Sequence, residues 1–454
     1  MQTIGHLGIR YARAQRFEPP VAVPFAGIGS EAGRPGPVAP QVPGMLENLL
    51  GIDTSSMDED CLFLNVFRPA SAHEGDALPV LVWIHGGAFQ NGSGSIPWYD
   101  GSNLAARGVI VVTINYRLGA FGYLGDRNCG TLDQVCALEW VRDNIARFGG
   151  DASNVTIFGE SAGGSGVLAL LAAPSADGLF HRAWSMSPSI RQLRGIDSAR
   201  GWEERFLEAA GVDGVDAART LDVTAVLEAQ AKVAAMPSDG YDMFAPTAGG
   251  AGLETDLHAA MERNPVPVVI GTNRDENSLF LAFDPEIAGC GRDKWIEHAR
   301  NHFGDAADDA VRVYEEHRDG ATPAQLIAAV QTDHVFRRPA QKVAESRVAA
   351  GNPTWMYWFT WGTPVFDGAL GSCHALDIPF AFDNIAAPGS EFMTGTGPER
   401  AAIAARFADE IVRFAVEGAP GWTAFNLDAR PTLRIDTLTE LLHDPEPQLR
   451  ELHP

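Results

Sequence analysis

Short apolar runs, each bounded by polar or glycine-containing segments, recur along the chain. Most of them are continuous and rich in valine and isoleucine, which is typical of strands that are buried on both faces of a sheet. The run LFLNVFR instead alternates along its length and carries β-forming side chains. These patterns predict strands at 62–68, 79–84, 109–114, 155–158, 266–270 and 354–361.

Apolar positions at helical spacing predict helices between these strands. In 133–148 the apolar residues recur at the spacing of one helix face, with Asp133 as the expected N-cap and Gly149 as the stop. Helical patterns also occupy 162–173 and 401–416.

Strands that alternate with helices predict an α/β protein, in which a mostly parallel sheet is covered by helices on both faces. No proline- or serine-rich linker divides the chain, so we expect one α/β unit over residues 1–454. The segments at approximately 190–260 and 280–350 are expected to be helical insertions that form a cap or side subdomain.

Composition narrows the classes of partner. The net charge of −24 over 454 residues argues against a nucleic-acid partner, because phosphate groups would be repelled. No apolar run is long enough to span a bilayer, and the first residues lack a continuous apolar stretch, so we expect a cytoplasmic protein without a membrane partner. Five cysteines without a CxxC pair predict neither a disulfide framework nor a zinc site, and therefore free thiols.

The sequence GESAGG places glycines two positions before and two positions after Ser161. The motif alone is weak in a chain with 48 glycines, and a flexible surface loop is the alternative. Here, however, it lies between a predicted strand and a predicted helix. This context indicates a nucleophile elbow, a tight turn that lifts the serine hydroxyl above the sheet.

A serine nucleophile needs backbone donors for the oxyanion that develops on the substrate. The glycine pair in HGGAF follows the predicted strand 79–84, where amide groups face a ligand without side chains in the way. We expect the amides of Gly86, Gly87 and Ala162 to form the oxyanion hole. An ordinary glycine turn is the alternative at this place.

The nucleophile also needs an acid that orients the base. Asp275 and Glu276 both follow the predicted strand 266–270, at the sheet edge where α/β proteins place their chemistry. The spacing alone does not choose between the two carboxyl groups. A solvated charged turn would explain both equally well.

The base is expected last in the chain, because this arrangement follows the order serine, acid, histidine. His374 lies in a loop after the predicted strand 354–361 and is the favoured base. The other histidines in this part of the chain lie in polar helical segments or in the tail and are expected at the surface or in packing: His298, His302, His317, His334, His443 and His453.

Several motifs resemble the type-B carboxylesterases of the α/β-hydrolase fold, a group with bacterial para-nitrobenzyl esterases, mammalian carboxylesterases and cholinesterases. They include EDCLFLNVFRP (59–69), NYRLGAFGYL (115–124) and FGGDASNVTIFGESAG (148–163), and the similarity spans nearly the whole chain. The resemblance implies Ser161 as nucleophile, Glu276 as acid and His374 as base. It also implies an oxyanion hole at Gly86, Gly87 and Ala162, with Glu160 as a buried glutamate that tunes the site.

Some features depart from the family pattern. No cysteine precedes Cys61, so the family disulfide at this position is absent. Residues 41–60 contain no aromatic side chain, whereas cholinesterases carry their choline-binding tryptophan there, which argues against choline esters. SPS at 187–189 replaces an SGS-like stretch, and a short N-terminal region is expected to open the gorge entrance.

The resulting prediction is a serine ester hydrolase that works through an acyl-enzyme intermediate, without a metal or organic cofactor. We expect small to medium, apolar or aromatic esters as substrates and a monomer or small homo-oligomer. Hydrolysis of carbamates or amides by the same residues is one alternative, and an esterase-like binding protein without catalysis is another. Four aromatic residues either line an apolar gorge or pack in the core: Phe89, Trp98, Phe280 and Trp358.

Overall fold

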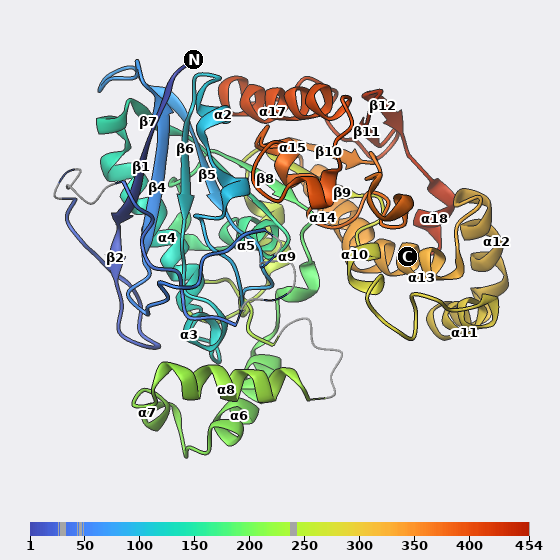
Figure 1. The fold of residues 1–454 in the computed structure, drawn as a ribbon, viewed down its shortest axis with the longest axis horizontal. Coiled ribbons are helices and arrows are strands. Elements are labelled where there is room, and N and C mark those ends of the chain that lie inside the picture. The colour runs from blue at the N-terminus through green and yellow to red at the C-terminus, as the bar shows by residue number, and fades with distance from the viewer. Residues whose placement is uncertain are drawn as a thin grey trace.

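A ten-stranded sheet forms the centre of the molecule (Figure 1). The computed structural model describes residues 1–25, 27, 33–42, 44, 48, 50–236 and 243–453. Neighbouring strands are parallel from β6 to β11, and the strands outside this central part pair antiparallel. In spatial order the strands are β1 (Thr3–Arg10), β4 (Phe63–Pro69), β6 (Ile110–Ile114), β5 (Leu78–Ile84), β7 (Gly150–Glu160), β8 (Arg182–Met186), β9 (Val268–Asn273), β10 (Thr354–Phe359), β11 (Pro431–Ile435) and β12 (Glu440–His443). A separate two-stranded sheet pairs β2 (Ala12–Arg13) with β3 (Val21–Ala22).

All six predicted strands are present, although their ends shift by a few residues. The sequence patterns missed β1, β2, β3, β8, β11 and β12. β8 reads RAWSM, and its arginine and serine interrupt the apolar pattern on which the other predictions rest.

Alternate side chains of the central strands enter two different hydrophobic cores. In β5, Val80, Val82 and Ile84 belong to one core, whereas Leu81 and Trp83 belong to the other. This alternation follows from the two-residue period of a strand and shows that both faces of the sheet are covered. The covering helices of the first face include α3 (Gly119–Tyr123), α4 (Cys129–Asn144) and α5 (Ala162–Leu170), and those of the second face include α2 (Ser102–Ala105), α15 (Ile378–Ala381), α16 (Glu391–Thr394) and α17 (Arg400–Glu417).

Two groups of helices lie beside this body. One group, below the sheet in Figure 1, contains α6 (Ile196–Ala210), α7 (Val215–Ala218) and α8 (Val223–Ala234), and α9 (Leu257–Arg263) follows it in the chain. Residues 237–242 of this predicted insertion lie outside the described part of the chain. The other segment contains α10 (Ser278–Leu281), α11 (Arg292–Phe303), α12 (Ala307–His317), α13 (Pro323–Thr332), the π-helix η6 (Asp333–Arg337) and α14 (Arg338–Ala349), and α18 (Pro447–Glu451) packs against it. The division into one α/β unit with two insertions stays a prediction.

The expectation that Asp133 caps a helix is wrong. Helix α4 begins at Cys129 after Asn128, so Asp133 lies inside the helix. Its carboxylate is fully buried and accepts hydrogen bonds from Arg117 Nε and from a terminal nitrogen of the same guanidinium, both at 2.7 Å. A buried charge needs such a partner, which explains an aspartate within the helix. Gly149, at φ 89°, ends the 3₁₀ turn that follows α4, as predicted.

Asp133→Asn is expected to lower the free energy of unfolding by about 3–5 kcal/mol, because it leaves the buried Arg117 charge without a counter-ion. Asp143→Asn is the matched control, since Asp143 pairs with Arg142 at the exposed surface and should change stability little. Thermal and denaturant unfolding followed by circular dichroism compare the two variants. Equal effects would contradict the assignment of Asp133 to a buried, structurally required ion pair.

All five cysteines are free, in agreement with the prediction from their number and spacing. Within the described part of the chain, no helix has the length and apolar character that crossing a membrane requires.

Candidate active site

Ser161 lies at the sharp turn between β7 and α5, as the elbow prediction requires. Its backbone has φ 59° and ψ −124°, a conformation that non-glycine residues rarely adopt. The flanking glycines are required by close packing: a Cβ atom on Gly163 would lie 2.0 Å from the Ile84 carbonyl oxygen, and one on Gly159 would lie 2.6 Å from the same oxygen. The turn is therefore a tightly packed elbow and not a flexible loop.

Two loops bring an imidazole and a carboxylate to this serine. His374 Nε2 lies 2.8 Å from Ser161 Oγ, and His374 Nδ1 lies 2.6 Å from Glu276 Oε2. The other carboxylate oxygen of Glu276 accepts a hydrogen bond of 2.7 Å from the backbone N–H of Asn273 at the end of β9. Both His374 and Glu276 are almost fully buried. A hydroxyl, an imidazole and a carboxylate thus lie in one line.

Asp275, the other candidate acid, faces away from this line. Its carboxylate accepts a hydrogen bond of 2.8 Å from the backbone N–H of Ser372 and one of 3.0 Å from Arg274 Nε. These contacts hold the loop before His374 in place. Of the other histidines, His302, His334 and His453 meet one another instead of the serine.

The glycine pair of the predicted oxyanion hole passes directly beside the nucleophile. A Cβ atom on Gly86 would lie 3.1 Å from Ser161 Cβ, and Gly87 has a φ of +102° that favours glycine. The ring of His85 stacks on Tyr116 at 4.4 Å, and His85 Nδ1 lies 2.7 Å from the Gly86 carbonyl oxygen, so the turn is fixed.

The three predicted donors are free to bind a ligand oxygen. The N–H groups of Gly86 and Gly87 find no backbone acceptor among the described residues. Ala162 is the first residue of α5, and the first N–H groups of a helix have no acceptor within it.

Three buried carboxyl groups surround His374. Glu160 Oε1 lies 3.2 Å from His374 Nε2, on the opposite side of the ring from the Nδ1 contact with Glu276. Asp377, which the sequence analysis did not single out, accepts hydrogen bonds from Tyr357 Oη at 3.2 Å and from Asn273 Nδ2 at 3.3 Å. Burial raises the pKa of Glu160 to about 8 and that of Asp377 to about 7. Burial alone would lower the pKa of His374, but the carboxyl groups outweigh it and raise this pKa to about 9.

The raised pKa of His374 predicts a pH profile. His374 accepts a proton only when neutral, so kcat/KM should rise with pH along a limb above the ordinary histidine pKa of about 6.5. Glu160 is ionised above its own pKa of about 8, the range in which His374 loses its proton. Glu160→Gln removes this negative neighbour of the imidazolium, so the pKa of His374 falls and the limb moves to lower pH. Initial rates measured from about pH 5 to about pH 10 test this. A limb that does not move in the variant would show that Glu160 leaves the His374 pKa unchanged.

A cavity of about 360 Å³ opens at the serine. Of the four aromatic residues considered above, Phe280 lines it, whereas Phe89 and Trp98 are fully buried in the cores and Trp358 packs under Arg337. The structure adds Phe336 from the π-helix η6, whose ring lies 5.0 Å from the His374 ring. The remaining wall residues include Leu50, Ile96, Ser189, Gln192, Asn277, Leu279 and Ile378.

Two predicted departures from the family bear on this wall. Ser189 of the SPS stretch lines the cavity. In the aromatic-free stretch 41–60, residues 43, 45–47 and 49 lie outside the described part of the chain, and Leu50 is aliphatic and reaches the wall.

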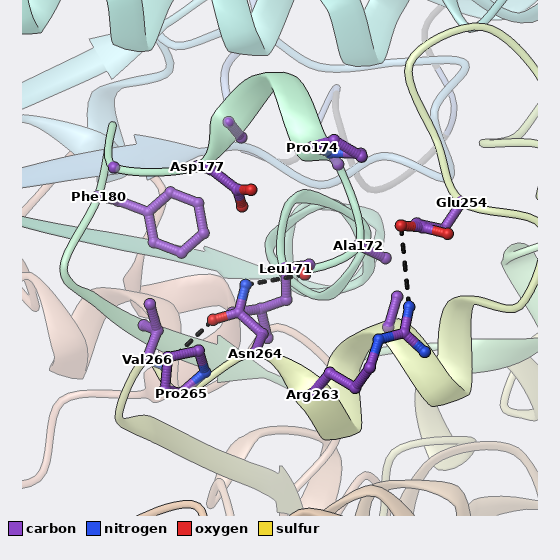
Figure 2. A pocket seen from close by; sticks show the side chains of 14 residues that line it. Leu171, Ala172, Pro174, Asp177, Phe180, Glu254, Arg263, Asn264, Pro265 and Val266 are labelled. Atoms are coloured by element: carbon purple, nitrogen blue, oxygen red, sulfur yellow. Dashed lines mark hydrogen bonds and ion pairs between the residues drawn. The ribbon is translucent and has the colours of Figure 1, made fainter.

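Figure 2 shows a second cavity, of about 430 Å³, between the end of α5 and α9. Several of its polar groups bind each other: Asn264 Nδ2 donates to the Leu171 carbonyl at 2.9 Å, and Arg263 pairs with Glu254 at 3.8 Å. Among the described residues, no serine, cysteine or histidine lines it.

Comparison with known proteins agrees with this geometry. The model of the carboxylesterase family matches residues 2–446. Para-nitrobenzyl esterase of Bacillus subtilis is 35% identical over 98% of this chain and 93% of its own length. A Rhodococcus erythropolis protein described as a "probable N-octanoylanthranilate hydrolase" is 37% identical over 84% of this chain and 81% of its own.

Among solved structures, a carboxylesterase of Geobacillus stearothermophilus superposes with a TM-score of 0.86 at 34% identity, covering 100% of this chain and 96% of that one. The elbow, the doubly covered sheet and these matches over nearly the full length all indicate the same family. The chain belongs to the carboxylesterase family, has its α/β-hydrolase fold, and is an ester hydrolase.

Proposed function

We propose that Ser161 is the nucleophile of this esterase, with His374 as its base and Glu276 as the acid that orients the base. Ser161 Oγ attacks the ester carbonyl carbon while His374 Nε2 takes the hydroxyl proton. His374 then gives this proton to the leaving alkoxide as the ester C–O bond breaks. Water then gives a proton to the same imidazole and attacks the acyl carbon. The bond from this carbon to Ser161 Oγ breaks, His374 returns the proton to Oγ, and the carboxylic acid leaves. The observation that carries the proposal is the pair of distances at His374, 2.8 Å to Ser161 Oγ and 2.6 Å to Glu276 Oε2.

The oxyanion of each tetrahedral intermediate is proposed to bind the amides of Gly86, Gly87 and Ala162. One such donor contributes about 2.7–4 kcal/mol to the stabilisation of the transition state. Glu160 is proposed to act on the site only through the charge that it presents to His374.

Small to medium, apolar or aromatic esters are the proposed substrates. The cavity volume of about 360 Å³ supports this size. Its apolar wall residues include Leu279, Phe280, Phe336 and Ile378, which suit an acyl or alcohol group without charge.

A covalent serine probe tests the proposal most directly. A fluorophosphonate should label the chain once, at Ser161, and abolish hydrolysis of an aryl ester. Labelling at another serine, or no labelling, would contradict the assignment. An ester panel that varies acyl and alcohol groups separately then measures which part the apolar wall selects.

Hydrolysis of N-acyl compounds by the same residues is the second candidate, favoured by the name of the Rhodococcus erythropolis relative. The two activities differ in their product. Release of a free amine from an N-acyl arylamine, at a kcat/KM comparable to that for the matched ester, would favour the second candidate.

Localisation and assembly remain proposals as well. Five free thiols support a reducing, cytoplasmic location, and a net charge of −24 supports the absence of a nucleic-acid partner. We propose a monomer or small homo-oligomer, which light scattering coupled to size-exclusion chromatography would distinguish.

A further inference from the structure

Three histidines from distant parts of the chain meet on the side of the molecule away from β1. His302 comes from α11, His334 from the π-helix η6, and His453 from the segment after α18. Each offers one ring nitrogen, and these nitrogens all lie within 4.8 Å of one another. Figure 1 shows α11 and α18 in this region, near the C-terminal end.

We propose that His302, His334 and His453 form a binding site for a divalent transition-metal ion of the kind that imidazole favours, with Zn²⁺ as the representative. Imidazole nitrogens bind Zn²⁺ at about 2.0–2.1 Å, so tetrahedral ligands lie about 3.4 Å apart. The side chains of His302 and His334 are partly or largely exposed and can close the remaining distance by rotation. Water would complete the coordination.

A hydrogen-bond chain behind His453 orients its ring for this role. His453 Nε2 lies 2.8 Å from Tyr314 Oη, and Tyr314 Oη donates to Asp333 Oδ2 at 2.7 Å. All three side chains are buried. With Nε2–H donated to the tyrosine, Nδ1 is the nitrogen that carries a free lone pair. Metal-binding histidines are commonly held in this way, through a second ring nitrogen that leads to a carboxylate.

The charged groups around the cluster act in both directions. Arg191, Arg338 and Lys342 lie near the imidazoles and oppose a metal ion. The Asp333 carboxylate, which accepts the hydrogen bond from Tyr314, favours it.

A fourth imidazole stands beside the three. The ring of His298, one helical turn before His302 in α11, stacks on the His302 ring at 6.2 Å and 11°. His298 Nε2 is buried and finds no hydrogen-bond partner among the described residues. A buried ring nitrogen beside the cluster is therefore left without a hydrogen-bond partner in the described part of the protein.

The proposed ion would join three elements and would take no part in the chemistry at Ser161. None of the three histidines lines the cavity at the serine. Phe336 does line it, two residues after His334 in the same π-helix. The ion would therefore fasten the C-terminal segment to α11 and to the helix that carries one wall of the active site.

Zinc titration of the whole, chelator-treated protein tests the proposal. Calorimetry should show one saturable site, and Zn²⁺ should raise the Tm. His302→Gln combined with His334→Gln changes two non-buried side chains, so the variant should fold, weaken zinc binding by more than about 100-fold and lose the Tm shift. His258→Gln, at an exposed histidine of α9 outside the cluster, is the matched control and should bind as the parent does.

Tyr314→Phe separates the orienting chain from the ligands. It keeps the buried ring and removes the hydroxyl, so zinc affinity should fall by about 10–100-fold. Co²⁺ gives an independent reading, because nitrogen ligands in a tetrahedral site produce visible absorption bands that the double variant should lack. Absence of zinc binding to the parent would overturn the proposal. Undiminished binding by the double variant would also overturn it, since the metal would then bind elsewhere, such as at thiols or His374.

Discussion

Ser161→Ala is expected to lower kcat for ester hydrolysis by about 10⁴- to 10⁶-fold. The variant keeps the cavity and the oxyanion amides but loses the hydroxyl that lies 2.8 Å from His374 Nε2 and is proposed to attack the carbonyl carbon. Residual turnover would then depend on water and on transition-state binding by the amides. Stopped assays with an aryl ester at high enzyme concentration measure the loss, and the fluorophosphonate probe should no longer label the protein.

The control for this prediction is that the Ser161→Ala variant keeps its fold and stability. Ser161 contributes its backbone N–H to the Met186 carbonyl at 2.9 Å, and alanine keeps this bond, so Tm and circular dichroism should change little. His374→Ala should reduce kcat to a similar degree, and the double variant should lose no more than either single one, because the two residues act as one unit. Additive losses, or a single variant within tenfold of the parent, would contradict the shared role.

The sheet could be predicted where a strand is buried on both faces. β5 and β6 read as continuous apolar runs because helices cover the two sides of the sheet, and periodicity detects this burial directly. β8 occupies an equally central position, yet Ser185 and Arg182 break its run. Ser185 Oγ donates to the Gly164 carbonyl at 3.0 Å, a tertiary contact that no local pattern reveals.

The elbow was predictable because its constraint is local. Close approach of β5, β7 and α5 leaves no room for a Cβ atom at Gly159 or Gly163, and this requirement appears in the sequence as glycine at fixed spacing around Ser161. The order of serine, acid and histidine along the chain also favoured His374. These are short-range or sequential signals, so one chain suffices to detect them.

The parts that sequence reasoning missed depend on orientation in three dimensions. Asp377 enters the site because the turn after His374 directs it toward Tyr357 and Asn273. Phe336 reaches the cavity from a π-helix, in which the usual helical spacing of side chains does not apply. The assignment of Asp133 as a cap failed for a related reason, since the pattern could not show that Arg117 would meet it inside the protein.

The choice between two adjacent acids shows the same limit, and it gives the second large prediction. Glu276→Gln should lower kcat by about 10³- to 10⁴-fold. A carboxylate accepts a hydrogen bond from His374 Nδ1–H, which keeps the proton on Nδ1 and leaves Nε2 as the base. An amide in its place can donate to Nδ1, which favours the tautomer with the proton on Nε2, and that tautomer cannot accept the proton of Ser161.

Asp275→Asn is the matched comparison, because it makes the same chemical change one residue earlier. The Asp275 carboxylate accepts hydrogen bonds from Ser372 N–H at 2.8 Å and from Arg274 Nε at 3.0 Å. The amide oxygen of asparagine can still accept one of these bonds. We therefore expect a kcat within about tenfold of the parent and a modest fall in Tm. Single-turnover rates of both variants on one ester decide between the acids. A greater loss of kcat at Asp275 than at Glu276 would show that the acid in solution is not the one that faces His374 here.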